Sequence, residues 1–478
     1  MPFSDFHDQH AATLRAALNS ATWRAALARG AIEAAREALL TPPPTANVFS
    51  TPVDQLKAIN GPRVREMIAS GERDEERLLQ TLGTWPDTWP REVPLRLSFL
   101  GLNLTSACDM SPRCVYCNQR PVSQRMGTDD WRRVIEGAAD QGGDGPYLYL
   151  TGGEPLLLGE DLWGSAGLIR FATGIGAACN LNTNALQLTP QVALGLVSAG
   201  LGRMHVSLDT HLAQVQDSIC RRTGRWEQVM AGLHNVQLAK ALLGVSHPVI
   251  HINCVLTRLN ADGYPDFLRL LLSMKPRPVE GRSPDLDMHL IPVGGEANAS
   301  LRLTQEGYLR FFTDTWEQVE EVWAQYQEEC GSADKDRGPL HARVPFLSPY
   351  HRVRQDGDLA GWAARAADGR PGALAMAARC YVAPTQGFIL PNGEQHWCGG
   401  HATSRPEPVG NTLHRSVRES IMASLPAVRC LPGEHCHTCA GATLAINQTV
   451  ESRLKEALAG WLHPEQEQGA GTPEPGFE

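Results

Sequence analysis

The sequence has 478 residues, enough for a sizeable hydrophobic core and for more than one structural unit. Its composition, with 42% hydrophobic and 20% charged residues, is that of an ordinary globular protein, and its net charge of −9 argues against a nucleic-acid binder with a broad basic surface. No apolar run approaches the roughly 18 residues that cross a bilayer, and the charged N-terminus does not resemble a signal peptide. We therefore expect a cytoplasmic protein with neither a membrane nor a nucleic acid as its partner.

The first part of the chain, residues 1–92, is predicted to be a helical region. Residues 12–40 are rich in Ala, Leu, Arg and Glu and predict one helix, which the Pro-rich stretch 41–52 ends. Further helical stretches follow as far as residue 82. We assign no chemistry to this region.

From about residue 95, short apolar runs alternate with helix-length amphipathic segments. The runs are 95–104, 146–151, 176–184, 203–210, 249–257 and 286–293. This alternation predicts the α/β class, with a parallel sheet and right-handed crossovers that form a partial (β/α)6 barrel. In such folds ligands bind at the carboxyl ends of the strands.

Three cysteines in the loop after the first predicted strand, Cys108, Cys114 and Cys117, are the most informative residues. An odd number of thiols cannot all pair as disulfides, and the cytoplasm keeps thiols reduced. Clustered thiolates suit a soft metal or an iron–sulfur cluster, and three ligands leave a fourth coordination position open. The alternatives are a structural zinc with one more ligand, or loop cysteines without a metal.

Polar residues follow the next three strands. The Gly152-Gly153-Glu154 segment follows the second strand, where paired glycines allow a ligand to approach the backbone and a carboxylate can accept bonds from an ammonium group. The third and fourth strands end in Asn182, Asn184, Ser207 and Asp209. Either Arg221 or Arg222, shortly beyond, could hold a carboxylate.

This combination resembles the radical S-adenosylmethionine (SAM) enzymes. In that family three cysteines hold a [4Fe–4S] cluster, SAM chelates the remaining iron, and reductive cleavage gives a 5′-deoxyadenosyl radical that abstracts a substrate hydrogen. The resemblance implies that the three cysteines are the cluster ligands, and it implies SAM contacts from Tyr116, Gly152, Gly153, Glu154, Asn184, Ser207 and Asp209. The family's Cys-x3-Cys-x2-Cys spacing is here Cys-x5-Cys-x2-Cys, so the geometry around Cys108 is not carried over.

A second group of cysteines lies near the C-terminus, at Cys380, Cys398, Cys430, Cys436 and Cys439. A hairpin predicted at 388–397, with its turn at 391–393, brings the first two together. The group resembles the SPASM or twitch extension of a subset of radical SAM enzymes. That resemblance implies one auxiliary [4Fe–4S] cluster held by Cys380, Cys398, Cys436 and Cys439, with Cys430 able to replace one of them or to stay free. An all-cysteine zinc site is the alternative.

The sequence thus predicts five segments, which are a helical N-terminal region (1–92), a radical SAM core (93–300), a helical linker (301–375), an auxiliary cluster domain (376–460) and a disordered tail (461–478). The resemblance implies a radical SAM enzyme that modifies a peptide or protein and takes electrons from a reductant such as flavodoxin or ferredoxin. Oxidation of a small alcohol or sugar is the nearest alternative. A non-catalytic iron–sulfur carrier and a zinc-stabilised binding protein are the alternatives from other classes.

Overall fold

The computed structural model describes residues 3–39, 43–44, 46, 48–119, 121–139, 145–274, 287–293, 296–330, 358–369, 379–404, 407–428, 431 and 442–464. A nine-stranded sheet forms its centre, with the order β6-β5-β4-β3-β2-β1-β7-β8-β9. The first six strands are parallel and each pairs with its neighbour in sequence, as consecutive β/α units do when every crossover turns the same way. They are β1 Phe99–Asn103, β2 Tyr147–Thr151, β3 Ala178–Thr183, β4 Arg203–Ser207, β5 Val249–Leu256 and β6 Asp287–Pro292. The predicted α/β class and parallel sheet are confirmed.

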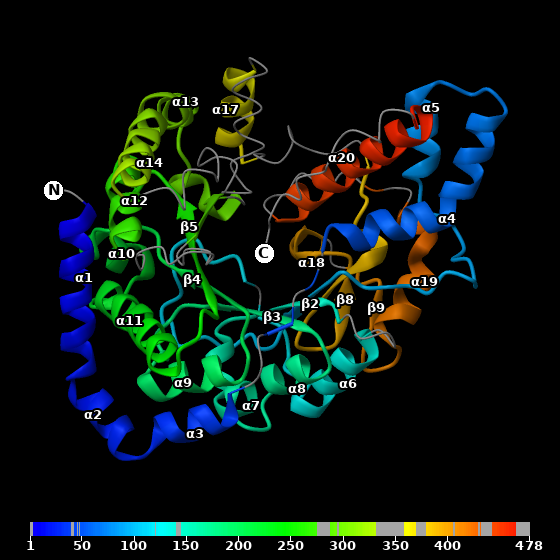
Figure 1. Ribbon diagram of the computed structural model, residues 1–478. Helices are drawn as coiled ribbons and strands as arrows, with labels where there is room; N and C mark the ends of the chain where they lie inside the picture. The colour runs from blue at the N-terminus through cyan, green and yellow to red at the C-terminus, as the bar shows by residue number, and fades with distance from the viewer. Residues whose placement is uncertain are drawn as a thin grey trace.

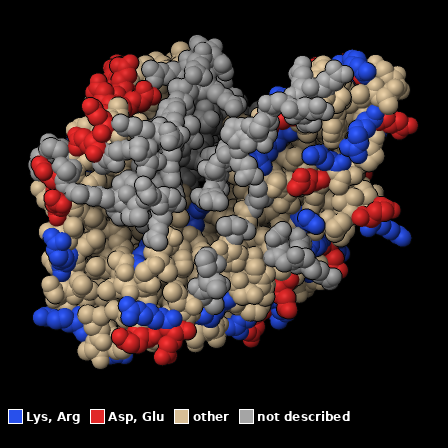
Figure 2. Space-filling model, viewed as in Figure 1, with Lys and Arg blue, Asp and Glu red and all other residues tan. Residues whose placement is uncertain are grey.

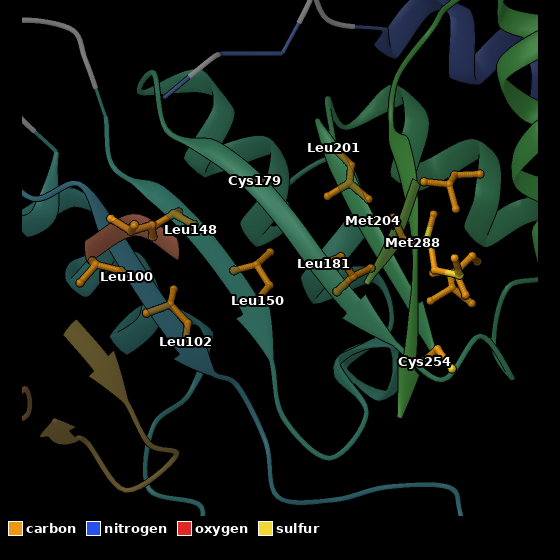
Figure 3. Packing of buried hydrophobic residues seen from close by; sticks show 14 of the residues in the cluster. Leu100, Leu102, Leu148, Leu150, Cys179, Leu181, Leu201, Met204, Cys254 and Met288 are labelled. Atoms are coloured by element: carbon orange, nitrogen blue, oxygen red, sulfur yellow. The ribbon is translucent and has the colours of Figure 1, made fainter. Parts of the chain in front are cut away.

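The two faces of this sheet carry different side chains, because alternate residues of a strand point to opposite sides. The apolar side chains of Leu100, Leu148, Leu181 and Ile252 expose 0% of their surface and form the core beneath the helices. Figure 3 shows the leucines of β1 to β3 aligned in this layer. Each leucine buried in this way contributes roughly 1.5–3 kcal/mol. The opposite face is polar and partly exposed, with Asn103, Tyr149, Arg203 and Asn253 among its residues.

The connecting helices lie between successive strands in the sequence and cover the apolar face of the sheet (Figure 1). They are α6 Thr128–Ala138, α7 Glu160–Trp163, α8 Leu168–Gly174, α9 Pro190–Ser198, α10 Ala213–Cys220, α11 Arg225–Leu243 and α12 Tyr264–Ser273, with a short 3₁₀ helix η1 at Pro155–Leu158. This leaves the carboxyl ends of the strands free to carry a site.

The N-terminal region is helical, as predicted, but the prediction of a single helix over 12–40 is wrong. The helices of this region are α1 Phe3–Leu18, α2 Ala21–Ala28, α3 Ala31–Ala38, α4 Ser50–Ala69 and α5 Glu75–Leu82. Ser20 ends the continuous pattern because its hydroxyl accepts a hydrogen bond from Trp23 N and begins a new helix. Gly30 adopts the left-handed conformation, with φ 66°, and separates α2 from α3.

The first three helices wrap the outside of the core, along the left and lower edges of Figure 1. Helix α1 packs against α11, α12 and α14 (Trp316–Cys330), while α2 and α3 pack against α9. Trp23 Nε1 donates to Asn235 Oδ1 at 2.8 Å, and His10 Nε2 lies 2.9 Å from Gln237 Oε1. These polar contacts therefore hold α1 and α2 in place against α11.

The predicted hairpin is confirmed, and it extends the central sheet. Strands β7 (Gln386–Ile389) and β8 (Glu394–His396) are antiparallel, and β9 (Gly410–Asn411) pairs with β8. Strand β7 lies parallel to β1, so the hairpin continues the sheet beyond its first strand. Gly101 allows this packing, because a Cβ there would lie 2.2 Å from the Phe388 ring.

The remaining elements are η2 Glu296–Leu301, α13 Gln305–Arg310, a π-helical turn η3 at Phe311–Thr315, α17 Leu359–Ala367, η6 Ala383–Thr385, α18 Gly399–Ser404, α19 Val417–Val428 and α20 Ala442–Leu462. Helix α20 packs against α4 and α5. Acidic side chains gather over α13 and α14, at the upper left of Figure 2. Within the described residues, no helix is both long and apolar enough to cross a membrane.

Candidate functional site

The three predicted cluster cysteines lie together on the loop that leaves the carboxyl end of β1. Cys108 and Cys114 are partly buried and Cys117 is exposed. The Cys108 sulfur accepts hydrogen bonds from Met110 N at 3.5 Å and from Asn184 Nδ2 at 3.8 Å. Cys117 N donates to the Cys114 carbonyl at 3.1 Å, which makes a tight turn of the Cys-x2-Cys half.

The Gly152-Gly153-Glu154 segment holds this loop in place through its backbone. Gly153 N donates to the Thr105 carbonyl at 2.6 Å, and Glu154 N donates to the Ala107 carbonyl at 2.8 Å. A Cβ on Gly153 would lie 2.0 Å from the Ala107 oxygen, and one on Gly152 would lie 2.5 Å from the Thr105 oxygen. The close approach that these glycines allow is therefore made by the chain's own cysteine loop.

Glu154 is a fully buried carboxylate at the end of β2. It exposes 0% of its surface and accepts hydrogen bonds from Leu156 N at 3.0 Å, Thr183 Oγ1 at 2.8 Å and Asn184 N at 2.7 Å. Burial nevertheless raises the pKa of Glu154 to about 7, because these donors do not replace the lost hydration of its charge. A cationic ligand group beside this carboxylate would favour its ionised form.

Asp209, beyond the end of β4, is the second buried carboxylate, with 1% exposure. It accepts from Tyr116 Oη at 2.8 Å and from Val255 N at 2.8 Å, and Gln216 Nε2 lies 3.4 Å away. Burial raises the pKa of Asp209 to about 6. Tyr116, two residues after Cys114, is thereby fixed to the end of β4.

Asn184 lies at the junction of these parts, after β3. Its side-chain nitrogen donates to Asp109 Oδ1 at 2.7 Å as well as to the Cys108 sulfur, so it fastens the cysteine loop from the other side. Ser207 ends β4 beside Asn253 of β5 and is partly exposed. The strand-end residues predicted from the sequence are thus gathered at one edge of the sheet.

The two predicted arginines lie at the surface, and a third arginine is buried at the site. Arg221 and Arg222 are exposed, and Arg222 Nη1 donates to the Asp109 carbonyl at 3.3 Å. Arg225, with 1% exposure, donates through Nη2 to the Asn184 carbonyl. Its Nε and Nη1 are buried and have no hydrogen-bond partner among the described residues. Sequence reasoning missed Arg225, although it is the first residue of α11.

The three cysteines are a donor set whose chemistry suits an iron–sulfur cluster. Among the described residues, no three Cys, His, Asp or Glu side chains converge on one point that could hold one ion. Each ligand of a four-iron cluster binds a different iron atom. The ligands therefore lie on one loop but need not converge on one point. Cys108, Cys114 and Cys117 meet that requirement.

The second cysteine group is described only in part. Cys380 and Cys398 flank the β7–β8 hairpin and are both partly buried. His401 N donates to the Cys398 sulfur at 3.4 Å, and Tyr381 N donates to Asn447 Oδ1 of α20 at 2.7 Å. Cys430, Cys436 and Cys439 lie outside the described residues.

Comparison with known proteins gives one family match. Residues 102–271 match the model of the Radical SAM superfamily. An AdoMet-dependent heme synthase from Oleidesulfovibrio alaskensis is 29% identical over 171 residues, which cover 35% of this chain and 40% of that protein. A GTP 3′,8-cyclase from Heliobacterium modesticaldum is 31% identical over 214 residues, covering 44% and 58%. The chain thus spans about two to three fifths of the length of these curated relatives.

Two solved structures are similar at low identity. SuiB of Streptococcus suis bound to S-adenosylmethionine has a TM-score of 0.45 and 13% identity, covering 74% of this chain and 72% of that one. The enzyme anSMEcpe with bound AdoMet has a TM-score of 0.48 and 13% identity, covering 78% and 98%.

Proposed function

We propose that this chain cleaves SAM reductively and removes a hydrogen atom from a substrate. The premise is its membership of the Radical SAM superfamily, whose model matches residues 102–271. The observation that carries this proposal is the pairing of the cysteine loop with the Gly-Gly-Glu segment. Two backbone hydrogen bonds, Gly153 to Thr105 and Glu154 to Ala107, join them at the strand ends. A plain metal-stabilised loop would not need a buried carboxylate at that place.

The ligand roles follow from chemistry. Cys108, Cys114 and Cys117 would hold a [4Fe–4S] cluster, which when bound supplies the electron that breaks a carbon–sulfur bond of SAM and yields the 5′-deoxyadenosyl radical. Glu154 would accept hydrogen bonds from the amino group of SAM, and its buried charge would be offset by that ammonium.

Arg225 would bind the SAM carboxylate. Its guanidinium is buried, and two of its nitrogen atoms lack partners among the described residues, which is costly unless a ligand acceptor pairs with them. Arg225 replaces Arg221 and Arg222 in this role, because both of those side chains are exposed. Tyr116 and Asn184 would keep their predicted places beside SAM while they hold Asp209 and the cysteine loop.

The substrate that we propose first is a peptide or protein, and the reductant is a flavodoxin or a ferredoxin. This rests on the C-terminal hairpin, whose flanking cysteines, Cys380 and Cys398, would join Cys436 and Cys439 around one auxiliary [4Fe–4S] cluster, with Cys430 as a substitute ligand. A small-molecule substrate is the second candidate, and the curated relatives favour it, since their names state heme and GTP.

The test is anaerobic purification, followed by iron, sulfide and zinc analysis and then addition of reductant and SAM. We expect iron with equimolar sulfide and formation of 5′-deoxyadenosine. Zinc without iron would contradict the proposed radical SAM activity. Intact, reducible clusters without cleavage of SAM would indicate an electron carrier. Adding GTP or a peptide encoded beside the chain's gene then separates the substrate classes, since the true substrate accelerates cleavage.

A further inference from the structure

A fourth thiol lies at the cysteine loop and has no role in the proposed chemistry. Cys220 is the last residue of α10 and exposes 3% of its surface. Its sulfur accepts a hydrogen bond from Gln216 Nε2, one helical turn earlier, at 3.3 Å. The Cys114 side chain lies close enough to this thiol to lower its pKa.

The backbone brings Cys114 and Cys220 close together. Val115 N donates to the Ile219 carbonyl at 2.9 Å, so the residues next to Cys114 and Cys220 are joined directly. Because a cysteine side chain has only one rotatable bond before its sulfur, two thiols meet only where their backbones are close. Arg221 then takes the left-handed conformation, with φ 53°, which ends α10 at this point.

The other cysteines are placed differently. The Cys108 sulfur is held by Met110 N and by the side chain of Asn184, and Cys117 is exposed. Cys179 and Cys254 are core residues on β3 and β5, with 1% and 0% exposure. Among the described cysteines, Cys114 is thus the one that the fold places against Cys220.

We propose that Cys114 and Cys220 form a disulfide when the cluster is absent and a low-molecular-weight disulfide such as oxidised glutathione is present. One protein thiol attacks the glutathione disulfide, breaks its S–S bond and releases one glutathione. The second thiol attacks the resulting mixed disulfide, forms the Cys114–Cys220 bond and releases the second glutathione. The two protein thiols are oxidised, the two thiol protons pass to the released glutathione, and glutathione is reduced.

This disulfide would be a reversible modification of a cluster ligand. Disulfides in the cytoplasm are commonly transient and redox-sensing, and this one would withhold Cys114 from cluster assembly until it is reduced. The inference rests on the proposed function only for the role of Cys114 as a ligand. The thiol pair itself depends on the contact between the loop and α10.

The test uses the full chain purified without iron, reduced, desalted under anaerobic conditions and treated with oxidised glutathione. Remaining free thiols are alkylated, and the digested protein is mapped by mass spectrometry. We expect one linked peptide pair that contains Cys114 and Cys220 and that separates on reduction. The Cys220→Ser variant should lose this pair, whereas Cys179→Ser, a matched buried control, should keep it.

Two outcomes would overturn the inference. One is full alkylation of Cys220 while other cysteines are oxidised, and the other is pairing of Cys114 with Cys108 or Cys117 in the unmodified sequence. A second measurement follows iron uptake, which we expect the oxidised protein to lose and to regain after reduction. The reduced protein, reconstituted and given SAM, tests the proposed function separately, so the linked pair can fail while cleavage succeeds, or the reverse.

Discussion

Replacing Gly153 by alanine should displace the cysteine loop and impair the site while the fold survives. A Cβ at this position would lie 2.0 Å from the Ala107 oxygen and 2.9 Å from the Ser106 oxygen. Contacts of a Cβ below 3.0 Å are essentially never seen, so the Ala107 carbonyl has to move by at least about 1 Å. Both obstructing atoms are backbone atoms, which cannot rotate away.

The cost has a stability part and a functional part. The displacement weakens the hydrogen bonds from Gly153 N and Glu154 N to the loop, each of which contributes about 1 kcal/mol net. A local loss of about 2 kcal/mol leaves a chain of this size folded. A shift of about 1 Å at a reacting group costs on the order of a hundredfold in rate, so SAM cleavage should fall by that factor.

The assay compares iron content, the thermal midpoint and 5′-deoxyadenosine formation for Gly153→Ala and for a matched control, Gly137→Ala. A Cβ at Gly137, inside α6, meets nothing within 4 Å, and alanine there favours the helix by up to about 1 kcal/mol. The control should equal or exceed the unmodified protein in every measurement. Normal iron content and normal cleavage in Gly153→Ala would refute the argument that these glycines serve the loop contact.

Three further predictions concern charge, pH and the second cysteine group. Glu154→Gln keeps the shape but removes the buried charge, so SAM affinity measured by calorimetry should fall about tenfold, and unchanged affinity would contradict the ammonium contact. Burial lowers the pKa of His234 to about 4 and also lowers that of His10, so the folded state binds fewer protons than the unfolded chain, whose histidines have a pKa of 6.5. The stability that these two uncharged histidines contribute is therefore fully present above pH 6.5 and is lost as the pH falls toward 4. His234→Phe should flatten the fall of the thermal midpoint between pH 7 and pH 5. An unaltered slope would show that this histidine does not cause the fall. Cys398→Ala should remove iron without abolishing SAM cleavage, whereas Cys114→Ala should abolish cleavage, and loss of the same iron in both variants would exclude two separate sites.

The parallel core could be predicted because its strands are buried beneath the helices. Residues such as Leu100 and Leu148 lie in short apolar runs that alternate with helix-length segments, a pattern typical of a parallel sheet covered by helices. The meeting of Glu154, Asn184 and Asp209 followed from the same topology, since parallel strands place their carboxyl ends at one edge. The sequence order of the strands therefore implied both the sheet and the place of the candidate site.

Other features depend on contacts that no local pattern specifies. The positions of Cys220 and Arg225 follow from the turn between α10 and α11, where Arg221 adopts a left-handed conformation and reverses the chain. Their neighbours Arg221 and Arg222 have the same charge as Arg225 but lie at the surface. Only the three-dimensional path of the turn distinguishes a buried guanidinium from two exposed ones.

The same limit applies to long-range pairing and to short breaks in helices. Strand β7 joins β1 across nearly three hundred residues, between Phe99 and Gln386, and hydrophobic periodicity does not encode such a partner. Within the predicted helix at 12–40, the alanines and leucines recur at helical spacing across two breaks, the cap at Ser20 and the left-handed Gly30. Both residues were visible in the sequence as an N-cap type and a helix breaker.

The most direct test of the central claim is the yield of 5′-deoxyadenosine from the anaerobically reconstituted, reduced protein with SAM. We expect this product to form, and we expect replacement of Cys108, Cys114 or Cys117 by alanine to abolish it. A protein that holds its iron and sulfide, accepts electrons and still leaves SAM intact would contradict the proposed radical SAM activity.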